Sequence, residues 1–332
     1  MHTRREEFAG LFDESIHGVV TARALTEASA GPSVIRRLAS EHALTWVARG
    51  VYVIGAPTGS WEQSVAIDLA AAGPDAVVAG AAAARLWGLD GFTTRSGDQP
   101  ATTAVLLNMS RRDGRRGANL RRVRGLEPHA LIGDLPLTGI NQTLIELGGT
   151  LPIALSPGGH RLTPEDQVEL ALESALRDQF TTIERLLEVL ADCGSRREGA
   201  AVLRAVLDRR PLGAPATESW METRCIQVLR NDGIVDVERQ VPVYDRRGRL
   251  IGRVDLMLRR IILECDGKQF HPDFEKDRER WAALQAMGHL VLPITFRQLE
   301  FGTTALLRTL RELLAVAARP AAPTSWGGSL PR

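Results

Sequence analysis

The sequence has few cysteines, no long apolar run and almost no net charge. Its three cysteines are far apart and lack the spacing of a metal site, so they fit a reducing cytoplasm rather than a disulfide framework. With a formal net charge of +1, any nucleic-acid surface has to come from local clustering of basic residues. No stretch reaches the roughly 18 apolar residues of a membrane helix, and the N-terminus lacks the apolar core of a signal peptide. We therefore expect a cytoplasmic protein without membrane contacts.

The length of 332 residues suggests several domains, and a hydrophobic content of 44% is ordinary for a globular protein. Pro211, Gly213 and Pro215 mark the clearest boundary. We expect a multi-domain α/β protein. Its segments are a winged helix-turn-helix at 1–55, a mixed α/β middle segment with helices at 56–150, a helical connector at 151–215, an α/β domain with a central mixed sheet at 216–316 and a disordered tail at 317–332.

The first 55 residues have the pattern of two short helices followed by a β hairpin. Thr21 and Ser33 are suited to cap the two helices, and the second helix carries Arg36 and Arg37 on its polar side. A turn at Arg49 joins the two strands of the hairpin. This order describes a winged helix-turn-helix that binds DNA, or else a helical packing module with a hairpin. The pattern alone leaves both interpretations open.

The stretch HGVVTARAL…SVIRRLASEHALTWVARGVYVIG, and above all its wing sequence RGVYVI, resembles the winged-helix domain of AbiEi-type antitoxins of toxin–antitoxin systems. Two patterns farther along, at Ala82–Leu89 and Leu135–Leu147, resemble the second domain of that family. The family's first domain binds promoter DNA, so the resemblance implies DNA as one partner and a toxin as another. The implied DNA contacts are Ser33, Arg36, Arg37 and Arg49. The arginine run at 111–124 is either a phosphate-contacting loop or a solvated hairpin tip.

Three acidic residues, Asp255, Glu264 and Asp266, interrupt two apolar runs that have the pattern of a β hairpin, Leu250–Leu258 and Ile261–Asp266. A loop of two or four residues would place Asp255 opposite Glu264, with Asp266 on the same face, whereas an odd-numbered loop would separate them. Two arginines suit a tight turn poorly, so we expect the longer loop. Like charges opposite each other destabilise a sheet, and a divalent cation such as Mg²⁺ would relieve that repulsion.

The C-terminal segment resembles the PD-(D/E)XK nucleases through the ordered blocks ESWMET, GRVDL, ECDGKQFH and DRERWAALQAMGHLVLPIT. Within that group it is most similar to the branch of the very-short-patch-repair (Vsr-like) endonucleases. The resemblance implies a restriction-endonuclease-like fold and a DNA endonuclease that depends on Mg²⁺ or Mn²⁺. The implied metal ligands are Asp255, Glu264 and Asp266. The other implied catalytic residues are Glu222 on the preceding helix, Lys268 and His271, with support from Asp277 and Arg280.

This chain departs from the nuclease pattern at two positions. Asp266 stands in place of the usual lysine, so Lys268 would have to supply that charge, and Pro293 stands where the family often has arginine. Simpler interpretations are an exposed turn residue for Lys268, a structural histidine for His271 and an intrahelical ion pair for Asp277 with Arg280. Two functions follow. One is a bacterial DNA endonuclease in repair or phage defence, and the other is a non-catalytic regulator or antitoxin that uses the nuclease fold to recognise DNA.

Overall fold

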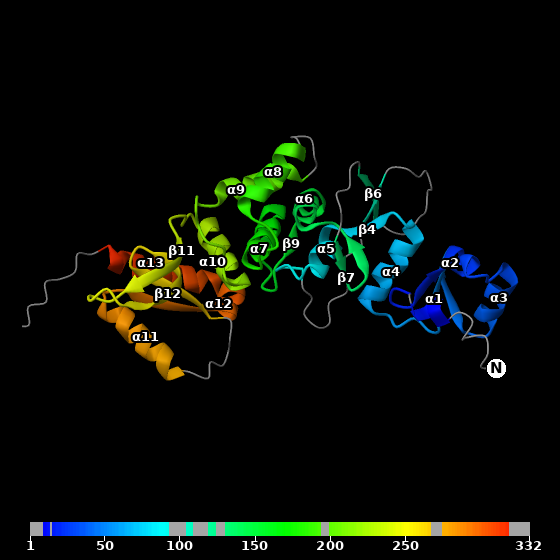
Figure 1. Ribbon diagram of the computed structural model, residues 1–332. Helices are drawn as coiled ribbons and strands as arrows, with labels where there is room; N and C mark the ends of the chain where they lie inside the picture. Colours follow the sequence, from blue (N-terminus) through cyan, green and yellow to red (C-terminus); the bar gives the residue numbers. More distant parts are fainter. Residues whose placement is uncertain are drawn as a thin grey trace, which may run out of the picture. The chain divides into compact units, whose positions relative to one another are not determined.

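The computed structural model describes residues 9–13, 15–92, 104–108, 119–123, 130–193, 199–266 and 274–318. The protein is a mixed α/β chain, as its sequence predicts (Figure 1). It divides into two compact units. The first consists of Met1–Pro152 and Gln179–Leu207, and the second of Ile153–Asp178 and Asp208–Arg332. Within the described residues, no helix is long and apolar enough to span a membrane.

The first unit begins with helices packed on a three-stranded antiparallel sheet of order β1-β3-β2. Thr21 caps one helix by accepting a hydrogen bond from the backbone nitrogen of Ala24. The expected cap at Ser33 is wrong. The next helix begins at Pro32 after Gly31, because proline is favoured in the first turn of a helix. These elements are α1 (Ala9–Asp13), β1 (Val19–Thr21), α2 (Ala22–Glu27), α3 (Pro32–Ser40), β2 (Leu44–Ala48) and β3 (Val51–Ile54).

A five-stranded mixed sheet of order β6-β5-β4-β8-β7 forms the rest of the first unit with its helices. All four residues of the central strand β4 are buried, and both α4 and α5 contact this strand. The elements are α4 (Trp61–Ala72), β4 (Ala76–Ala79), α5 (Gly80–Leu86), β5 (Ala104–Asn108), β6 (Asn119–Val123), β7 (Ala130–Ile132), β8 (Leu135–Leu137), α6 (Ile140–Thr150), α8 (Ile183–Cys193) and α9 (Ala200–Arg209), whose last residues belong to the second unit.

The second unit is built on a four-stranded mixed sheet of order β11-β12-β13-β14. The first three strands are antiparallel, and β14 runs parallel to β13 after the crossover helix α11. The elements are β9 (Ala154–Leu155), β10 (Arg161–Leu162), α7 (Pro164–Arg177), α10 (Trp220–Asn231), β11 (Glu238–Tyr244), β12 (Leu250–Leu258), β13 (Ile261–Asp266), α11 (Phe274–Ala286), β14 (Leu290–Thr295), α12 (Phe296–Phe301) and α13 (Thr303–Ala317).

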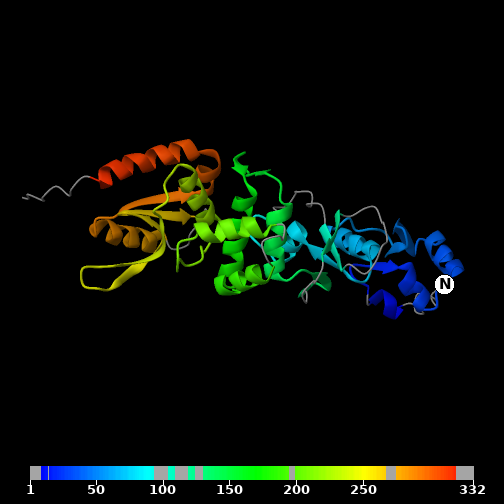
Figure 2. The ribbon, with the colours of Figure 1, turned by 90° about the horizontal axis from the view of Figure 1, so that it is seen from above.

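Helices cover both faces of this sheet (Figure 2). On one face, Leu256 and Leu263 pack with residues of α10, α12 and α13. On the other face, Met257 and Ile262 pack with Leu284 of α11. Side chains alternate along β13, so its even-numbered residues face α11, whereas in β12 both Val254 and Met257 pack with Leu284, so the alternation is interrupted between Val254 and Leu256, at Asp255. Glu264 therefore belongs to the α11 side of the sheet, where Arg280 of α11 reaches it.

Ion pairs join α7 to the elements around the sheet. Glu169 contacts Arg230 of α10 at 2.6 Å, and Glu173 contacts Arg239 of β11 at 2.5 Å and Arg210 at 3.1 Å. The helical connector expected at 151–215 is divided between the two units. Its residues 153–178 belong to the second unit and its residues 179–207 to the first. The five segments expected from the sequence otherwise stay predictions.

Candidate active site

The β12–β13 hairpin has the register that places its acids side by side. The pairs are Leu256 with Leu263, Met257 with Ile262 and Leu258 with Ile261. Asp255 and Glu264 are the next residues on the two strands. The loop has two residues rather than the expected four, and Arg259 adopts φ +57°, the positive value that the first position of such turns requires. The objection to two arginines in a tight turn was therefore wrong.

Asp255 is half-buried and fixed by the neighbouring strand. One of its oxygens, Oδ2, accepts a hydrogen bond of 2.8 Å from the backbone nitrogen of Cys265. Burial raises the pKa of Asp255, and the nearby carboxylate of Glu218 adds to that rise. The hydrogen bond from the Cys265 N–H and the charges of Arg280 and Arg253 lower this pKa, but the net shift is upward. The site therefore holds a carboxyl group that is costly to ionise.

Glu222 is a second buried acid, with 3% of its surface exposed, in the first turn of α10. Its Oε1 accepts a hydrogen bond from the Ser219 hydroxyl at 3.0 Å, and its Oε2 accepts bonds from the Glu218 backbone at 2.9 Å and the Gln240 amide at 2.7 Å. Burial raises the pKa of Glu222, and the charge of Asp255 raises it further. Glu222 and Asp255 are thus electrostatically coupled.

Gln240 donates a hydrogen bond to Glu222 and could not be found from the sequence. It lies in β11 between Arg239 and Val241, which pair with Leu256 and Val254, so it is level with Asp255. Its backbone has φ +52°, which interrupts the pairing at that point. The register is the same on both sides of Gln240, and a single residue with a positive φ leaves no sequence signal here. Ser219 did have a sequence signal, since Ser-x-x-Glu at 219–222 is the pattern of a helix N-cap.

Arg280 reaches from α11 to the carboxylate of Glu264. Its Nη2 lies 3.0 Å from Glu264 Oε1 and donates a hydrogen bond of 2.6 Å to the backbone oxygen of Arg253. Gly252 allows this path, because a Cβ there would lie 2.8 Å from Arg280 Nε. The structure therefore brings Arg280 to the acids, as the sequence suggested. Pro293 of β14 pairs with Glu264 in the parallel register.

Cys265 stands between two of the predicted metal ligands. Its contact with Cys225 of α10 and its burial raise the pKa of its thiol well above the usual range. A thiol with a raised pKa stays protonated at neutral pH, so it is neither a nucleophile nor a thiolate ligand. Oxygen atoms are thus the ligands that this part of β13 offers.

Several predicted site residues lie outside the described part of the chain. They are Lys268, His271 and the side chains of Asp266 and Asp277. The backbone of Asp266 ends β13, where it pairs with Thr295. Among the described residues, no group of three His, Cys, Asp or Glu side chains is placed to hold a metal. That search does not include the Asp266 side chain, so it leaves the predicted trio of ligands untested.

The two described acids of that trio have the chemistry that Mg²⁺ requires. Carboxylate oxygens are its preferred protein ligands, and it usually takes only one or two carboxylates from the protein. Within the described residues, one oxygen of Asp255 has a hydrogen-bond partner and the other has none. Burial and the coupling to Glu222 make the ionised form of Asp255 costly, and a bound cation would lower that cost. The residues present therefore fit the predicted ion.

The predicted DNA-contact residues lie on α3 and on the turn between β2 and β3. Ser33, Arg36 and Arg49 are exposed, and Arg37 is half-buried. Arg37 lies 3.8 Å from Glu41, a distance at which an exposed ion pair contributes little. These side chains are accessible to a ligand of the first unit.

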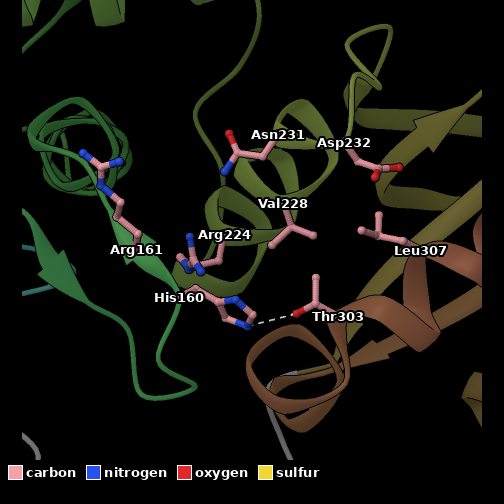
Figure 3. Close-up of a pocket in the computed structure, with 8 residues that line it drawn as sticks. All are labelled: His160, Arg161, Arg224, Val228, Asn231, Asp232, Thr303 and Leu307. Carbon is pink, nitrogen blue, oxygen red and sulfur yellow. Dashed lines mark hydrogen bonds between the residues drawn. The ribbon is translucent and has the colours of Figure 1, made fainter.

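A hollow of about 170 Å³ in the second unit is separate from these acids (Figure 3). It lies between β10, α10 and α13, and two of its lining atoms, His160 Nε2 and Thr303 Oγ1, lie 3.1 Å apart. No predicted site residue lines it. The lining residues are His160, Arg161, Arg224, Val228, Asn231, Asp232, Thr303 and Leu307. In comparisons with known proteins, neither a protein-family model nor a curated protein matches this chain.

Proposed function

We propose that this protein binds DNA and hydrolyses its phosphodiester bonds with Mg²⁺ or Mn²⁺ at Asp255 and Glu264. The observation that carries the proposal is the position of these two acids. They follow the last paired residues of adjacent strands, the charge of Arg280 acts on both of them, and the buried Glu222 is coupled to Asp255. Burial of like charges costs stability, and groups with pKa values shifted in this way are concentrated at functional sites.

The order of elements supports the assignment to the PD-(D/E)XK group. Helix α10 precedes three antiparallel strands, and the crossover helix α11 leads to the parallel strand β14. The blocks of sequence that resemble Vsr-like endonucleases fall on α10, β12, β13, α11 and β14 in that order. Acids on neighbouring strands of a mixed sheet are the arrangement that the resemblance implies.

Each residue of the site has a chemical task in this proposal. Asp255 and Glu264 would hold the ion, joined by Asp266. When bound, a divalent ion polarises the scissile phosphate and lowers the pKa of a water that becomes the nucleophile. Glu222 would orient that water, and Arg280, which lies 3.0 Å from Glu264, would hold Glu264 in position. Lys268 would stabilise the charge of the transition state, and His271 would transfer a proton to the leaving group.

The first unit would supply DNA affinity. The predicted DNA contacts lie on α3 and on the turn between β2 and β3, the two elements with which a winged helix-turn-helix contacts DNA. They are Ser33, Arg36, Arg37 and Arg49. Arginines at such positions bind phosphates and thereby fix the position of the protein on the duplex.

A non-catalytic regulator or antitoxin is the second candidate function, and one observation favours it. Glu264 already has Arg280 as a counter-charge at 3.0 Å, so its ionised form does not depend on a metal. In this case the sheet and its acids would recognise DNA without cutting it, and a toxin would be the second partner. Metal-dependent cleavage separates the two functions.

The test is cleavage of supercoiled plasmid and of mismatched duplex by the purified full-length protein with Mg²⁺ or Mn²⁺. Asp255→Asn is the main variant, because its amide oxygen can still accept the hydrogen bond from Cys265. Asp236→Asn is the control, because Asp236 is an exposed acid of the same unit. We expect cleavage by wild type and D236N and a loss of at least a hundredfold in D255N. DNA binding without cleavage by all three proteins would favour the regulator.

A further inference from the structure

The β11–β12 hairpin ends in a tip that carries arginines and exposed apolar side chains. The tip comprises residues 244–250, with the sequence YDRRGRL, and it projects from the sheet (Figure 2). Tyr244 and Leu250 are paired across the hairpin at its base, and they are 53% and 60% exposed. Arg246, Arg247 and Arg249 between them are all exposed. We call residues 244–250 the arginine tip.

Asp245 gives the arginine tip a fixed backbone. Its Oδ1 accepts hydrogen bonds from the backbone nitrogens of Arg247 at 2.8 Å and Arg249 at 2.9 Å, and its Oδ2 pairs with Arg249 Nε at 2.8 Å. These bonds lower the pKa of Asp245 against the effect of burial, so it remains ionised at neutral pH. Gly248 supplies the positive φ, +75°, that the turn needs. The turn is therefore ordered before it meets any ligand.

The arginine tip has an unbalanced positive charge. Asp245 pairs with Arg249, whereas the side chains of Arg246 and Arg247 make no ion pair or hydrogen bond to any described residue. Two free guanidinium groups on a preordered turn bind phosphate with little loss of conformational entropy. Tyr244 and Leu250 beside them provide apolar surface that can pack against sugars at the edge of a groove.

Strand β12, which forms one side of the arginine tip, also carries Asp255 of the proposed active site. Asp255 lies five residues beyond Leu250 in β12, which corresponds to about 17 Å at roughly 3.3 Å per residue. A DNA duplex advances about 3.4 Å per base pair, so this length corresponds to about five base pairs. A duplex with its scissile phosphate near Asp255 is thus long enough to reach the tip.

We propose that the arginine tip is a second DNA contact, in which Arg246 and Arg247 bind phosphates about five base pairs from the cleaved bond and Tyr244 and Leu250 pack beside them. This proposal rests on the proposed function, because it requires a duplex at Asp255. An acidic protein surface would also attract the arginines. DNA is favoured because the tip and the proposed catalytic acid are carried by the same strand.

The test compares the DNA affinity of the full-length protein with that of two double variants, without divalent ions and over a series of salt concentrations. R246Q/R247Q removes the two free charges of the arginine tip. R297Q/R308Q is the matched control, because it removes two exposed arginines from α12 and α13 of the same unit. We expect the slope of log affinity against log salt to fall by about 1.8 in R246Q/R247Q, with a loss of roughly thirtyfold at 0.15 M salt, and no change in the control.

A second pair of variants tests the apolar contact. Y244A/L250A should weaken binding at every salt concentration without changing the slope, whereas V235A, which alters an exposed apolar residue elsewhere in the unit, should not. Thermal unfolding checks that all variants are folded. R246Q/R247Q with the affinity and slope of its control would overturn the proposal and leave the tip to another partner, while cleavage by wild type upholds the proposed function. Absence of DNA binding by wild type would overturn both.

Discussion

Two acids of the proposed site are held in surroundings that disfavour their ionised forms. Asp255 and Glu222 both have a raised pKa, mainly because burial removes water from their carboxyl groups, and Asp255 raises the pKa of Glu222 further. An acid with a raised pKa binds more protons in the folded protein than in the unfolded one. Its ionisation therefore lowers the free energy of unfolding as the pH rises through the ordinary carboxyl range to the raised pKa.

The first prediction concerns the charge of Asp255. At pH 7.5 without metal, D255N should unfold at a temperature roughly 2–4 °C higher than wild type, the shift expected for about 1 kcal/mol. The reason is that asparagine keeps an acceptor for Cys265 and removes the charge that opposes Glu222. At pH 4 the difference should shrink, because the raised pKa of Asp255 favours protonation of the wild-type carboxyl group as the pH falls. Calorimetry at both pH values measures this, and an equal or lower unfolding temperature at pH 7.5 contradicts it.

Glu300 shows the opposite behaviour away from the site. Burial would raise its pKa, but hydrogen bonds from Ser156 and the Gly158 backbone, together with the charge of Arg224, lower it. A lowered pKa contributes stability above the ordinary carboxyl pKa, and this stability is lost as the pH falls through the folded-state value. Glu300 is fully buried and Arg224 nearly so, which makes each the required counter-charge of the other.

The second prediction follows from that pairing. E300Q should lower the free energy of unfolding by about 3 kcal/mol at pH 7, because it leaves the buried guanidinium of Arg224 uncompensated. E188Q, which breaks the exposed pair of Arg185 and Glu188, should change it by about 0.5 kcal/mol or less. Denaturant unfolding measures both variants. Equal effects of the two substitutions would show that the buried network does not stabilise the second unit.

At the scale of elements, the β12–β13 hairpin was the most predictable part of the site. Its strand bounds agree with those read from the apolar runs, and its register agrees with the expected one. The predicted loop length was wrong because Arg259 adopts a positive φ, which residues with a side chain rarely adopt. Local pattern determines such a hairpin, which explains why local reasoning was enough.

Long-range contacts were not predictable from the pattern. Gln240 meets Glu222 across 18 positions, and Ser156 meets Glu300 across 144. Nothing in the residue types at 153–178 indicates that they belong with the C-terminal sheet, because buried ion pairs between α7, α10 and β11 depend on the folded arrangement. The hydrogen-bond and ion-pair partners of the acids could therefore be identified only from the structure.

The third prediction tests how β9 and β10 are attached within the second unit. Gly158 lies against the backbone of Glu300, and a Cβ there would be 1.7 Å from the Glu300 carbonyl oxygen. Because backbone cannot yield as a side chain can, G158A should destabilise the second unit by more than about 2 kcal/mol. G10A, at a position with nothing within 4 Å, should be neutral. Wild-type stability of G158A in denaturant unfolding would contradict the close approach.

At the scale of the whole molecule, the proposed function combines a DNA-binding first unit with a hydrolytic second unit. A net charge of +1 gives no general attraction to nucleic acid, so affinity has to come from local groups of arginines. Two such groups are the arginines of α3 and the β2–β3 turn, and those of the arginine tip. We expect DNA binding to weaken steeply with salt, in proportion to the number of phosphates that these groups contact.

The most direct test of the proposed site is a titration of the metal-free full-length protein with Mn²⁺, followed by electron paramagnetic resonance of the free ion. We expect wild type and D236N to bind Mn²⁺ at a site that D255N lacks, and thermal unfolding of wild type but not of D255N to shift upward as Mn²⁺ is added. Equal Mn²⁺ binding by D255N and wild type, or no binding by wild type, would contradict a metal site at Asp255 and Glu264.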